Sequence, residues 1–335
     1  MTVMNMSNAI QCLKIHVEHK VPVWLWGPSG IGKTEIPHQL VKELGPDWNI
    51  IDWRANLHDP VDAHGLPVPD LVNNVTNWLA PSTLPIGGRF GKKGILLLDE
   101  INTASIAMQN ACLQMALEGR VGEHKLDNDW VCVATGNRAK DKAHVSRVST
   151  ALKNRFAHIE IEPDVDAWTK WALTNGVDKY LIAFMRFRRE LLHKAPIDDN
   201  QNAFPSPRQW VKAARYLGHS KELRLHLISS VVGHEAAIEC EGFLRVINDL
   251  PTLDEVLKSP DSAKVPSDPS AKYAITSMLA HGANRKTFKP ILQYAARLDR
   301  EFEVLAAVDA VRLHPELANT PDFGIWAVKH QDVTL

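Results

Sequence analysis

Short apolar runs alternate with helical patterns through the first half of the chain. Five runs have the length and composition of buried strands, and they cover residues 21–26, 49–53, 94–98, 130–134 and 157–161. Strands that are apolar nearly throughout are typical of a parallel sheet covered on both faces. Amphipathic segments between them, clearest over residues 34–44 and 105–118, supply the covering helices. The pattern therefore predicts an α/β fold in which a parallel sheet has helices on both faces.

The pattern changes to helices alone after Pro163 and stays helical to about Asn248. Residues 251–269 then contain four prolines and several serines and aspartates, which indicates a linker or an irregular loop. Helical patterning resumes at Ala271 and continues towards Val328. The pattern therefore predicts three parts, which are residues 1–163, 164–250 and 251–335.

One glycine-rich segment lies between the first predicted strand and the helix that follows it. The segment, called the P-loop below, consists of Gly27, Pro28, Ser29, Gly30, Ile31, Gly32, Lys33 and Thr34. Its pattern, G-x-x-x-x-G-K-[ST], lets backbone N–H groups and a helix N-terminus surround the phosphates of a nucleotide. Lys33 would add a positive charge, and the Thr34 hydroxyl would be a ligand of Mg²⁺. A glycine turn without function is the alternative, but the flanking strand and helix favour binding of ATP or ADP.

The third predicted strand ends in two acidic residues, Asp99 and Glu100. The carboxyl ends of parallel strands meet at one edge of a sheet, where ligands bind. We expect Asp99 to hold Mg²⁺ together with Thr34, and Glu100 to orient and deprotonate an attacking water. Acidic residues after an apolar run also occur at helix N-termini, and it is the P-loop upstream that favours a catalytic role.

Three further polar residues occupy positions from which they could contact a nucleotide. Asn137 follows the fourth predicted strand, so its amide could bind the γ-phosphate or the attacking water; a turn residue is the alternative. Arg155 directly precedes the fifth strand, and Arg208 opens a helix in the second half of the chain. An arginine from outside the P-loop can stabilise the charge that develops in phosphoryl transfer. Position alone distinguishes these two arginines from ordinary surface residues.

In this order the motifs resemble those of AAA+ ATPases. The P-loop corresponds to the Walker A motif and residues 96–100 to the Walker B motif. Asn137 corresponds to sensor 1, Arg155 to the arginine finger and Arg208 to sensor 2. Arg147 is an alternative candidate for the finger. The resemblance implies that these residues surround one ATP molecule and its Mg²⁺ ion.

More narrowly, the chain resembles the MoxR branch of that family. The segments that carry this resemblance are residues 59–67, 98–104, 109–111, 118–122 and 204–210. The resemblance covers residues 8 to about 250 and is weaker beyond them. One departure is the pair Ala63-His64, which stands where relatives often have a Leu-Arg pair.

The resemblance implies an AAA+ α/β nucleotide-binding domain over residues 1–163, a helical lid domain over 164–250, and a linker with a helical C-terminal extension over 251–335. It implies a homo-oligomeric ring, usually a hexamer, in which Arg155 acts on the ATP of the adjacent subunit. It also implies a helix-2 insert within residues 60–88 and a hairpin at residues 120–129. MoxR-type proteins often work with a von Willebrand factor A-domain protein and remodel or activate a protein client.

Composition bears on the choice of partner and compartment. Lysine and arginine number 38 against 39 acidic residues, which gives a formal net charge of -1. Such a chain attracts neither polyphosphates nor anionic membranes, and this argues against a nucleic-acid partner. Residues 1–14 lack the pattern of a signal peptide, and no apolar run reaches membrane-spanning length. Because the four cysteines are also far apart, as is typical of free thiols in a reducing compartment, we expect a cytoplasmic protein without a membrane partner.

One proline-interrupted loop combines imidazole and carboxylate groups. It contains His58, Asp59, Asp62 and His64. Such side chains together suit zinc or iron. Loops of this composition are usually solvated, so a metal site is the less favoured interpretation.

Two clusters of basic residues allow more than one interpretation. Arg89, Lys92 and Lys93 lie among glycines and could grip nucleic acid or an acidic client, although a solvated loop before a buried strand is favoured. In a later helix, Phe184 and Phe187 are interleaved with arginines, which could stack on bases. We expect instead that the two phenylalanines face inward and the neighbouring arginines face outward.

The sequence thus predicts a Mg²⁺-dependent ATPase that converts hydrolysis into conformational work on a protein client. A nucleic-acid-directed motor, or a restriction or defence remodeller, is the alternative that would use the same catalytic site. The near-neutral charge and the lack of a recognisable DNA-binding motif count against that alternative. A small-molecule kinase would share the P-loop but has no use for an arginine finger.

Overall fold

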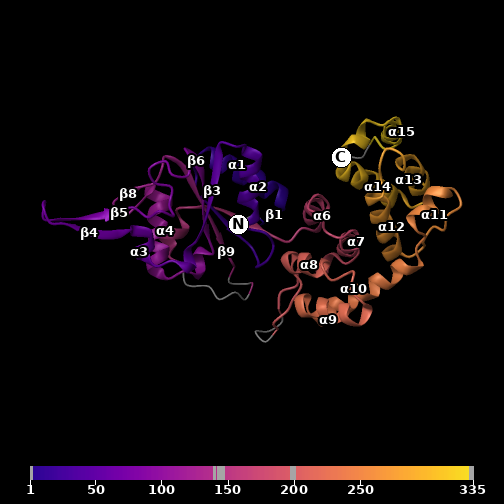
Figure 1. The fold of residues 1–335 in the computed structure, drawn as a ribbon, viewed down its shortest axis with the longest axis horizontal. Helices are drawn as coiled ribbons and strands as arrows, with labels where there is room; N and C mark the ends of the chain where they lie inside the picture. The colour runs from indigo at the N-terminus through magenta and orange to yellow at the C-terminus, as the bar shows by residue number, and fades with distance from the viewer. Residues whose placement is uncertain (1–2, 139–140, 142–147, 197–200, 332–335) are drawn as a thin grey trace. The chain divides into compact units, whose positions relative to one another are not determined.

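A parallel sheet forms the centre of the first part of the chain. The computed structural model describes residues 3–138, 141, 148–196 and 201–331, and the chain divides into two units, Met1–Pro163 and Asp164–Leu335 (Figure 1). Within the described residues, the strands of this sheet run in the order β1-β10-β2-β9-β6-β3, and every neighbouring pair is parallel. The strands are β1 (Val3–Met4), β2 (Val23–Trp26), β3 (Trp48–Arg54), β6 (Lys93–Asp99), β9 (Asp129–Gly136) and β10 (Ala157–Ile161).

Helices and two small hairpins occupy the connections of this unit. They are α1 (Met6–Glu18), α2 (Glu35–Leu44), η1 (Ala55–Leu57), α3 (Pro60–His64), the β4 (Leu66–Asp70) and β5 (Val75–Leu79) hairpin, η2 (Ile101–Thr103), α4 (Ile106–Glu118), the β7 (Arg120–Val121) and β8 (His124–Lys125) hairpin, and α5 (Thr150–Lys153). Several helices begin at the capping residues that their sequences supply. Ser105, for example, accepts a hydrogen bond from the Met108 backbone N–H and so starts α4.

The two faces of the sheet belong to two hydrophobic clusters. Val23 and Leu25 of β2 pack with α1 and α2 on one face, whereas Trp24 and Trp26 pack with α4 on the other. Successive side chains of a strand point to opposite faces, so an apolar strand buries both. The predicted α/β fold with helices on both faces of a parallel sheet is therefore confirmed.

All five predicted strands are present, and the structure adds a sixth, β1. A strand of two residues gives no periodicity, so the sequence could not indicate it. The hairpin predicted over residues 120–129 is present as β7 and β8. The insert expected within residues 60–88 contains α3 and the hairpin of β4 and β5.

The hairpin of β4 and β5 extends away from the sheet of its unit (Figure 1). Its turn is ordered by Asp70, whose Oδ1 accepts hydrogen bonds from the backbone N–H groups of Val72 (3.0 Å) and Asn73 (3.1 Å). The same turn displays Leu71 and Val72, which are 85% and 93% exposed. The hairpin thus carries an ordered apolar tip into solvent.

The second unit is helical in the residues that the structure describes. Its elements are α6 (Val165–Thr174), α7 (Lys179–Phe187), η4 (Arg189–Leu191), α8 (Pro207–Ala214), α9 (Lys221–Val232), α10 (His234–Val246), η5 (Ile247–Asp249), α11 (Leu253–Lys258), α12 (Pro269–His281), α13 (Phe288–Ala295), α14 (Arg300–Leu313), η6 (Pro315–Asn319) and α15 (Pro321–Lys329). Tyr273 and Leu313 each pack against both hydrophobic clusters of this unit. The segments predicted as lid and C-terminal extension are therefore packed together.

The predicted orientation of one arginine in α7 is wrong. Phe184 is buried as expected, but Arg186 is only 7% exposed and pairs with the fully buried Asp309 of α14. Its Nη2 donates to Asp309 Oδ1 at 3.0 Å. An arginine can be buried where a carboxylate neutralises it, and no pattern within α7 announces a partner 123 residues away.

The stretch predicted as a linker, residues 251–269, is also more ordered than expected. It contains α11, and Val256 in that helix is fully buried. Thr252 and Glu255 form a capping box that starts the helix. The Tyr294 hydroxyl donates to the Lys264 carbonyl at 2.6 Å, so the following loop is attached to the helical core as well.

All four cysteines are free thiols, as predicted. Burial raises the pKa values of Cys132 and Cys240 to about 12, and the same desolvation raises that of Cys112. Cys12 is half-buried. Among the described residues, no helix combines the length and apolar character that crossing a membrane would require.

Candidate active site

The P-loop connects β2 to α2 and has the backbone that its glycines permit. Gly27 has no room for a side chain, because a Cβ there would lie 2.6 Å from the Ile161 carbonyl oxygen. Gly30 and Gly32 have φ angles of 80° and 98°, in the left-handed region that favours glycine. Helix α2 begins directly after Thr34. The loop therefore leads into a helix N-terminus, the arrangement that binds phosphate groups.

Lys33 links the P-loop to the end of β9. Its side chain is 8% exposed, and its ammonium group donates to three oxygens at 2.8 Å each. Two of these are the carbonyl oxygens of Gly27 and Pro28, and the third is Oδ1 of Asn137. An ammonium group has three N–H donors, so these acceptors match its capacity. The predicted charge and the predicted sensor amide are thus in direct contact.

Asp99 forms a second polar junction at the same edge of the sheet. Its Oδ1 accepts hydrogen bonds from the hydroxyls of Thr34 (3.0 Å) and Thr135 (2.6 Å), and the residue is 7% exposed. The parallel registers place Thr135 beside Leu25 of β2 and one residue beyond the Leu98–Ala134 pair. Thr34, Asp99 and Thr135 form a compact set of oxygen atoms, the donor type that Mg²⁺ prefers.

Glu100 lies at the exposed side of this junction. Its backbone is left-handed, with φ 53° and ψ 38°, which is rare outside glycine and often occurs at functional sites. The Glu100 backbone N–H donates to the Thr135 hydroxyl at 2.9 Å. Its side chain accepts a hydrogen bond from Asn56 Nδ2 at 3.2 Å. The carboxylate is therefore held by an amide from η1, the segment that follows β3.

Asn137 is fixed by a second asparagine. Asn102, which is 2% exposed, donates from Nδ2 to the Asn137 carbonyl at 2.7 Å and accepts from the Asn137 backbone N–H at 3.3 Å. This reciprocal pair mimics a backbone ladder between η2 and the end of β9. Because the backbone is fixed, the Asn137 side chain stays directed at Lys33.

The next residue, Arg138, is neutralised by carboxylates. Its Nε donates to Asp141 at 2.7 Å, and its Nη1 donates to Glu160 at 2.8 Å and also to Glu162. The hydrogen bonds to Asp141, and then to Glu162 and Glu160, raise the pKa of Arg138 above its usual value. The cluster ties the end of β9 to β10 and surrounds the Arg138 guanidinium with three carboxylates.

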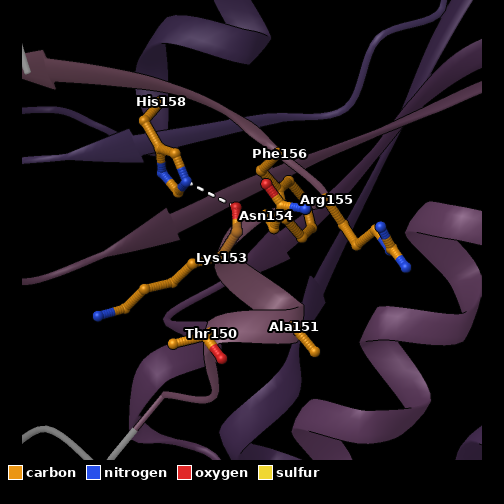
Figure 2. Close-up of a pocket in the computed structure, with 7 residues that line it drawn as sticks. All are labelled: Thr150, Ala151, Lys153, Asn154, Arg155, Phe156 and His158. Atoms are coloured by element: carbon orange, nitrogen blue, oxygen red, sulfur yellow. Dashed lines mark hydrogen bonds between the residues drawn. The ribbon is translucent and has the colours of Figure 1, made fainter.

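Arg155 lies at the opposite end of these strands. It occupies a tight turn, residues 153–156, in which the Phe156 N–H donates to the Lys153 carbonyl at 3.3 Å. Ala157 then pairs with Val23, the first residue of β2, whereas the P-loop follows the last. The exposed Arg155 guanidinium forms no hydrogen bond or ion pair with the part of the chain that the structure describes. Figure 2 shows it directed away from the turn, beside a pocket of about 640 Å³.

The other two candidate residues lie outside the described part of the first unit. Arg208 lies in the second unit, exposed in the first turn of α8. Arg147, the alternative finger, lies outside the described residues. The prediction for Arg208 therefore stays a prediction.

The weaker candidate sites have ordinary structural partners. His64 Nδ1 lies 2.6 Å from the Pro60 carbonyl, and His58 Nδ1 lies 3.5 Å from Asp62. No group of three or more potential metal ligands occurs among residues 3–138, 141, 148–196 and 201–331. In the basic loop, Arg89 donates to the Pro81 carbonyl at 3.1 Å.

Three residues of the constellation were missed by the sequence analysis: Thr135, Asn102 and Asn56. Thr135 looks like one more β-branched residue of a strand. The two asparagines look like turn residues. The signal that could have found them is their position, since each follows or ends an apolar strand at the edge where Asp99 lies.

Comparison with known proteins finds a family match within the first unit. Residues 22–156, less than half of the 335-residue chain, match the AAA domain of the dynein-related subfamily. No curated protein matches the chain.

Solved structures give weaker similarities. A candidate ATPase from Cytophaga hutchinsonii is 14% identical with a TM-score of 0.37, over 99% of this chain and 91% of the other. NtrX from Brucella abortus in complex with ADP is 13% identical with a TM-score of 0.41, over 98% and 68%. A mutant form of RuvB from Thermotoga maritima is 14% identical with a TM-score of 0.38, over 77% and 76%. TM-scores below 0.5 do not bear on function.

The matched residues contain the P-loop, Asp99, Glu100, Asn137 and Arg155. The family match and the geometry at the carboxyl ends of the strands concern the same residues. Residues 22–156 form an AAA domain, and the chain is an ATPase.

Proposed function

We propose that this ATPase is a Mg²⁺-dependent, MoxR-type AAA+ ring, most often a hexamer in that branch, that remodels or activates a protein client. The observation that carries the proposal is the joint arrangement of two polar contacts at one sheet edge. Lys33 contacts Asn137, which follows β9, and Thr34 contacts Asp99, the last residue of β6. Phosphate, metal and water would be held at this edge.

The proposed reaction is in-line attack of water on the γ-phosphate of ATP. Lys33 exchanges its carbonyl acceptors for phosphate oxygens and neutralises the charge that develops on them. Glu100 accepts the proton of the attacking water, and Asn137 orients that water or the γ-phosphate without adding charge. Asn56 donates to Oε2 of this carboxylate, so the proton of the water would pass to Oε1 while the amide holds the group in place.

The oxygen atoms of Thr34 and Asp99 fit a hard cation such as Mg²⁺. When bound, Mg²⁺ would supply positive charge that offsets the negative charge developing on the phosphate. Thr135 contributes by fixing the rotamer of Asp99, since its hydroxyl donates to the same carboxylate oxygen. Thr135 also accepts the Glu100 backbone N–H, so one hydroxyl positions both acidic residues.

The position of Arg155 supports a site shared between subunits. Strand β2 has four residues, so its two ends, one next to Arg155 and the other next to the P-loop, lie about 10 Å apart. This span is longer than an arginine side chain, which argues against contact with the phosphates of its own chain. We propose that Arg155 stabilises the transition state on a neighbouring subunit and that Arg208 couples the nucleotide state to the helical unit.

A protein client is supported by the tip of the β4–β5 hairpin. Exposed branched side chains on an ordered turn are suited to apolar contacts with another protein. A von Willebrand A-domain protein is the proposed partner, on the MoxR resemblance alone. The alternative, a nucleic-acid-directed motor, would be favoured if DNA or RNA raised ATP turnover severalfold.

The substitution Glu100→Gln tests the proposed chemistry. The amide has nearly the same shape but cannot accept a proton, so we expect ATP to bind with little change and turnover to disappear. Binding is measured with a fluorescent ATP analogue, and turnover by phosphate release. Glu43→Gln, on the exposed face of α2, is the matched control. Substantial hydrolysis by Glu100→Gln would remove this carboxylate from the role of base.

A further inference from the structure

In the turn that carries Arg155, one backbone carbonyl has two contacts. The Lys153 carbonyl accepts the Phe156 N–H at 3.3 Å, which closes the turn around Arg155. The same carbonyl is in contact with His158 Nε2 at 2.7 Å, the bond drawn in Figure 2. A carbonyl oxygen has two lone pairs, so both contacts can form at once. His158 therefore contacts a carbonyl oxygen that takes part in closing the turn, beside the hydrogen bond from the Arg155 N–H to the Leu152 carbonyl at 3.2 Å.

The second ring nitrogen of His158 fixes its tautomer. Trp26 Nε1 lies 2.8 Å from His158 Nδ1. An indole N–H can only donate, so Nδ1 must be the acceptor and the imidazole carries its proton on Nε2. That proton is then donated to the Lys153 carbonyl. The two bonds form a directed chain from the Trp26 indole through His158 to the backbone of the turn.

These two hydrogen bonds connect the end of β2 next to the P-loop with the turn that carries Arg155. Trp26 is the last residue of β2 and directly precedes Gly27. Trp26 is 8% exposed and stacks on Trp24 with a centroid distance of 4.4 Å. The indole is thus fixed by packing and serves as a rigid anchor for His158.

Trp24 makes a second set of contacts, with the segment next to Arg155 and with the segment next to Asn137. Trp24 makes an edge-to-face contact with Phe156 at 5.4 Å, next to Arg155. Trp24 also lies against Gly136, where a Cβ would be only 2.6 Å from the indole Nε1. Gly136 directly precedes Asn137. The two tryptophans of β2 therefore contact the segments that carry the sensor amide and the finger.

We infer that Trp26 and His158 are positioning residues for Arg155. Within one subunit, they connect β2, the strand that precedes the P-loop, to Arg155. This arginine is the one that the subunit offers to its neighbour. The inference rests on the proposed function, in which Arg155 acts between subunits. Neither residue touches ATP in this account, and both act through the carbonyl of Lys153. Loss of His158 lets the turn relax and displaces the guanidinium.

Subunit mixing distinguishes this role from a merely structural one. An arginine finger contributes roughly 10³- to 10⁵-fold to turnover, so we expect His158→Ala to lower ATP turnover at least about tenfold, with ATP affinity changed less than about twofold. Mixed with Glu100→Gln subunits, which still offer an intact Arg155, the His158→Ala subunits should regain activity. Mixed with Arg155→Ala subunits, the His158→Ala subunits should stay inactive, because neither variant offers its neighbour a correctly oriented Arg155.

The opposite mixing pattern overturns the inference. If His158 served its own subunit's nucleotide site, His158→Ala would stay inactive with Glu100→Gln and would rescue Arg155→Ala. Arg155→Ala mixed with Glu100→Gln is the reference experiment. If that mixture regains activity and the His158→Ala mixture does not, only the inference about His158 falls. If neither regains activity, the proposed intersubunit site is itself contradicted.

Two milder variants keep the test valid if His158→Ala folds poorly. Glutamine has both an acceptor and a donor, so His158→Gln should retain turnover within about threefold of the unchanged protein. Trp26→Phe keeps an aromatic ring and removes the N–H donor, so it should lower turnover and show the same mixing pattern as His158→Ala. Normal turnover in Trp26→Phe assemblies would overturn the chain of hydrogen bonds as the cause.

Discussion

The two units of this protein both bury charged side chains, but with different partners. In the first unit, Lys33 is 8% exposed and its ammonium contacts two carbonyls and one amide. In the second, the buried Asp309 receives hydrogen bonds from both Nη atoms of Arg186. The hydrogen bonds described for Lys33 end on neutral oxygens, which phosphate oxygens can replace, whereas the bidentate ion pair of Arg186 and Asp309 satisfies both partners. Burial alone therefore does not mark a functional charge, and the kind of partner does.

Removal of the Lys33 charge should have the largest effect. We expect Lys33→Ala to abolish ATP hydrolysis and to weaken ATP binding on the order of a hundredfold or more, because a desolvated partner of phosphate is lost. Stability should change little, because the hydrogen bonds that the ammonium donates to Gly27, Pro28 and Asn137 end on neutral oxygens. Binding is measured by calorimetry and unfolding by circular dichroism. Lys42→Ala, on the exposed side of the same helix, is the matched control.

Two results would contradict the functional role of Lys33. Suppose that Lys33→Ala strongly lowered the free energy of unfolding while ATP still stabilised the folded fraction. The lysine would then have a structural role, like Arg186. If it bound ATP normally, the phosphates would lie elsewhere.

Asp309→Ala should produce the reverse outcome. It leaves the Arg186 guanidinium buried without its main partner, which typically costs about 3–5 kcal/mol in the free energy of unfolding. ATP affinity measured under native conditions should be unchanged. Urea unfolding of the full chain measures the loss. Replacement of both partners, with Arg186→Met and Asp309→Leu together, should recover most of the lost stability.

The buried pair would lose its structural role if Asp309→Ala lowered the free energy of unfolding by less than about 1 kcal/mol, as is typical of an exposed ion pair. It would also lose that role if this substitution lowered ATP affinity while the protein stayed folded. Either result would mean that the pair is not the structural element inferred from its burial.

The two charged positions also differ in how far the sequence could predict them. Lys33 lies in a local motif whose spacing implies its chemistry, and Asp99, Glu100 and Asn137 each follow an apolar strand. Arg186 lacks any such local context, because its partner is 123 residues away. A helical pattern indicates which face is apolar, but it cannot indicate that a carboxylate from another helix will neutralise a residue on that face.

The contacts missed at the site share this cause. Thr135 reaches Asp99 only because the parallel registers of β2, β9 and β6 bring their ends together. His158 reaches the Lys153 carbonyl only because β10 pairs with β2 in one register. Strand order and register are long-range properties, so the local pattern gave the fold class and the motifs without these supporting side chains.

An exposed ion pair of the second unit should have the smallest effect. Arg189 donates to Asp166 through both Nη atoms, at 2.9 and 2.7 Å, but the two side chains are 53% and 68% exposed. The hydrogen bond from Arg189 lowers the pKa of Asp166. Solvent screening limits such pairs, so Arg189→Ala should cost less than about 1 kcal/mol in urea unfolding. If Arg189→Ala lowered the free energy of unfolding as much as Asp309→Ala, the bidentate geometry of an ion pair would matter more to stability than its burial.

The central claim is that one subunit cannot complete the hydrolytic site, because Arg155 lies at the other end of the strands from the P-loop. The most direct measurement mixes two inactive variants, Arg155→Ala and Glu100→Gln, over a range of ratios and follows phosphate release. A shared site predicts that activity appears in mixtures and peaks at intermediate ratios, where Glu100→Gln subunits supply Arg155 to neighbours that keep Glu100. Absence of activity at every ratio, in assemblies shown to contain both variants, would contradict the claim.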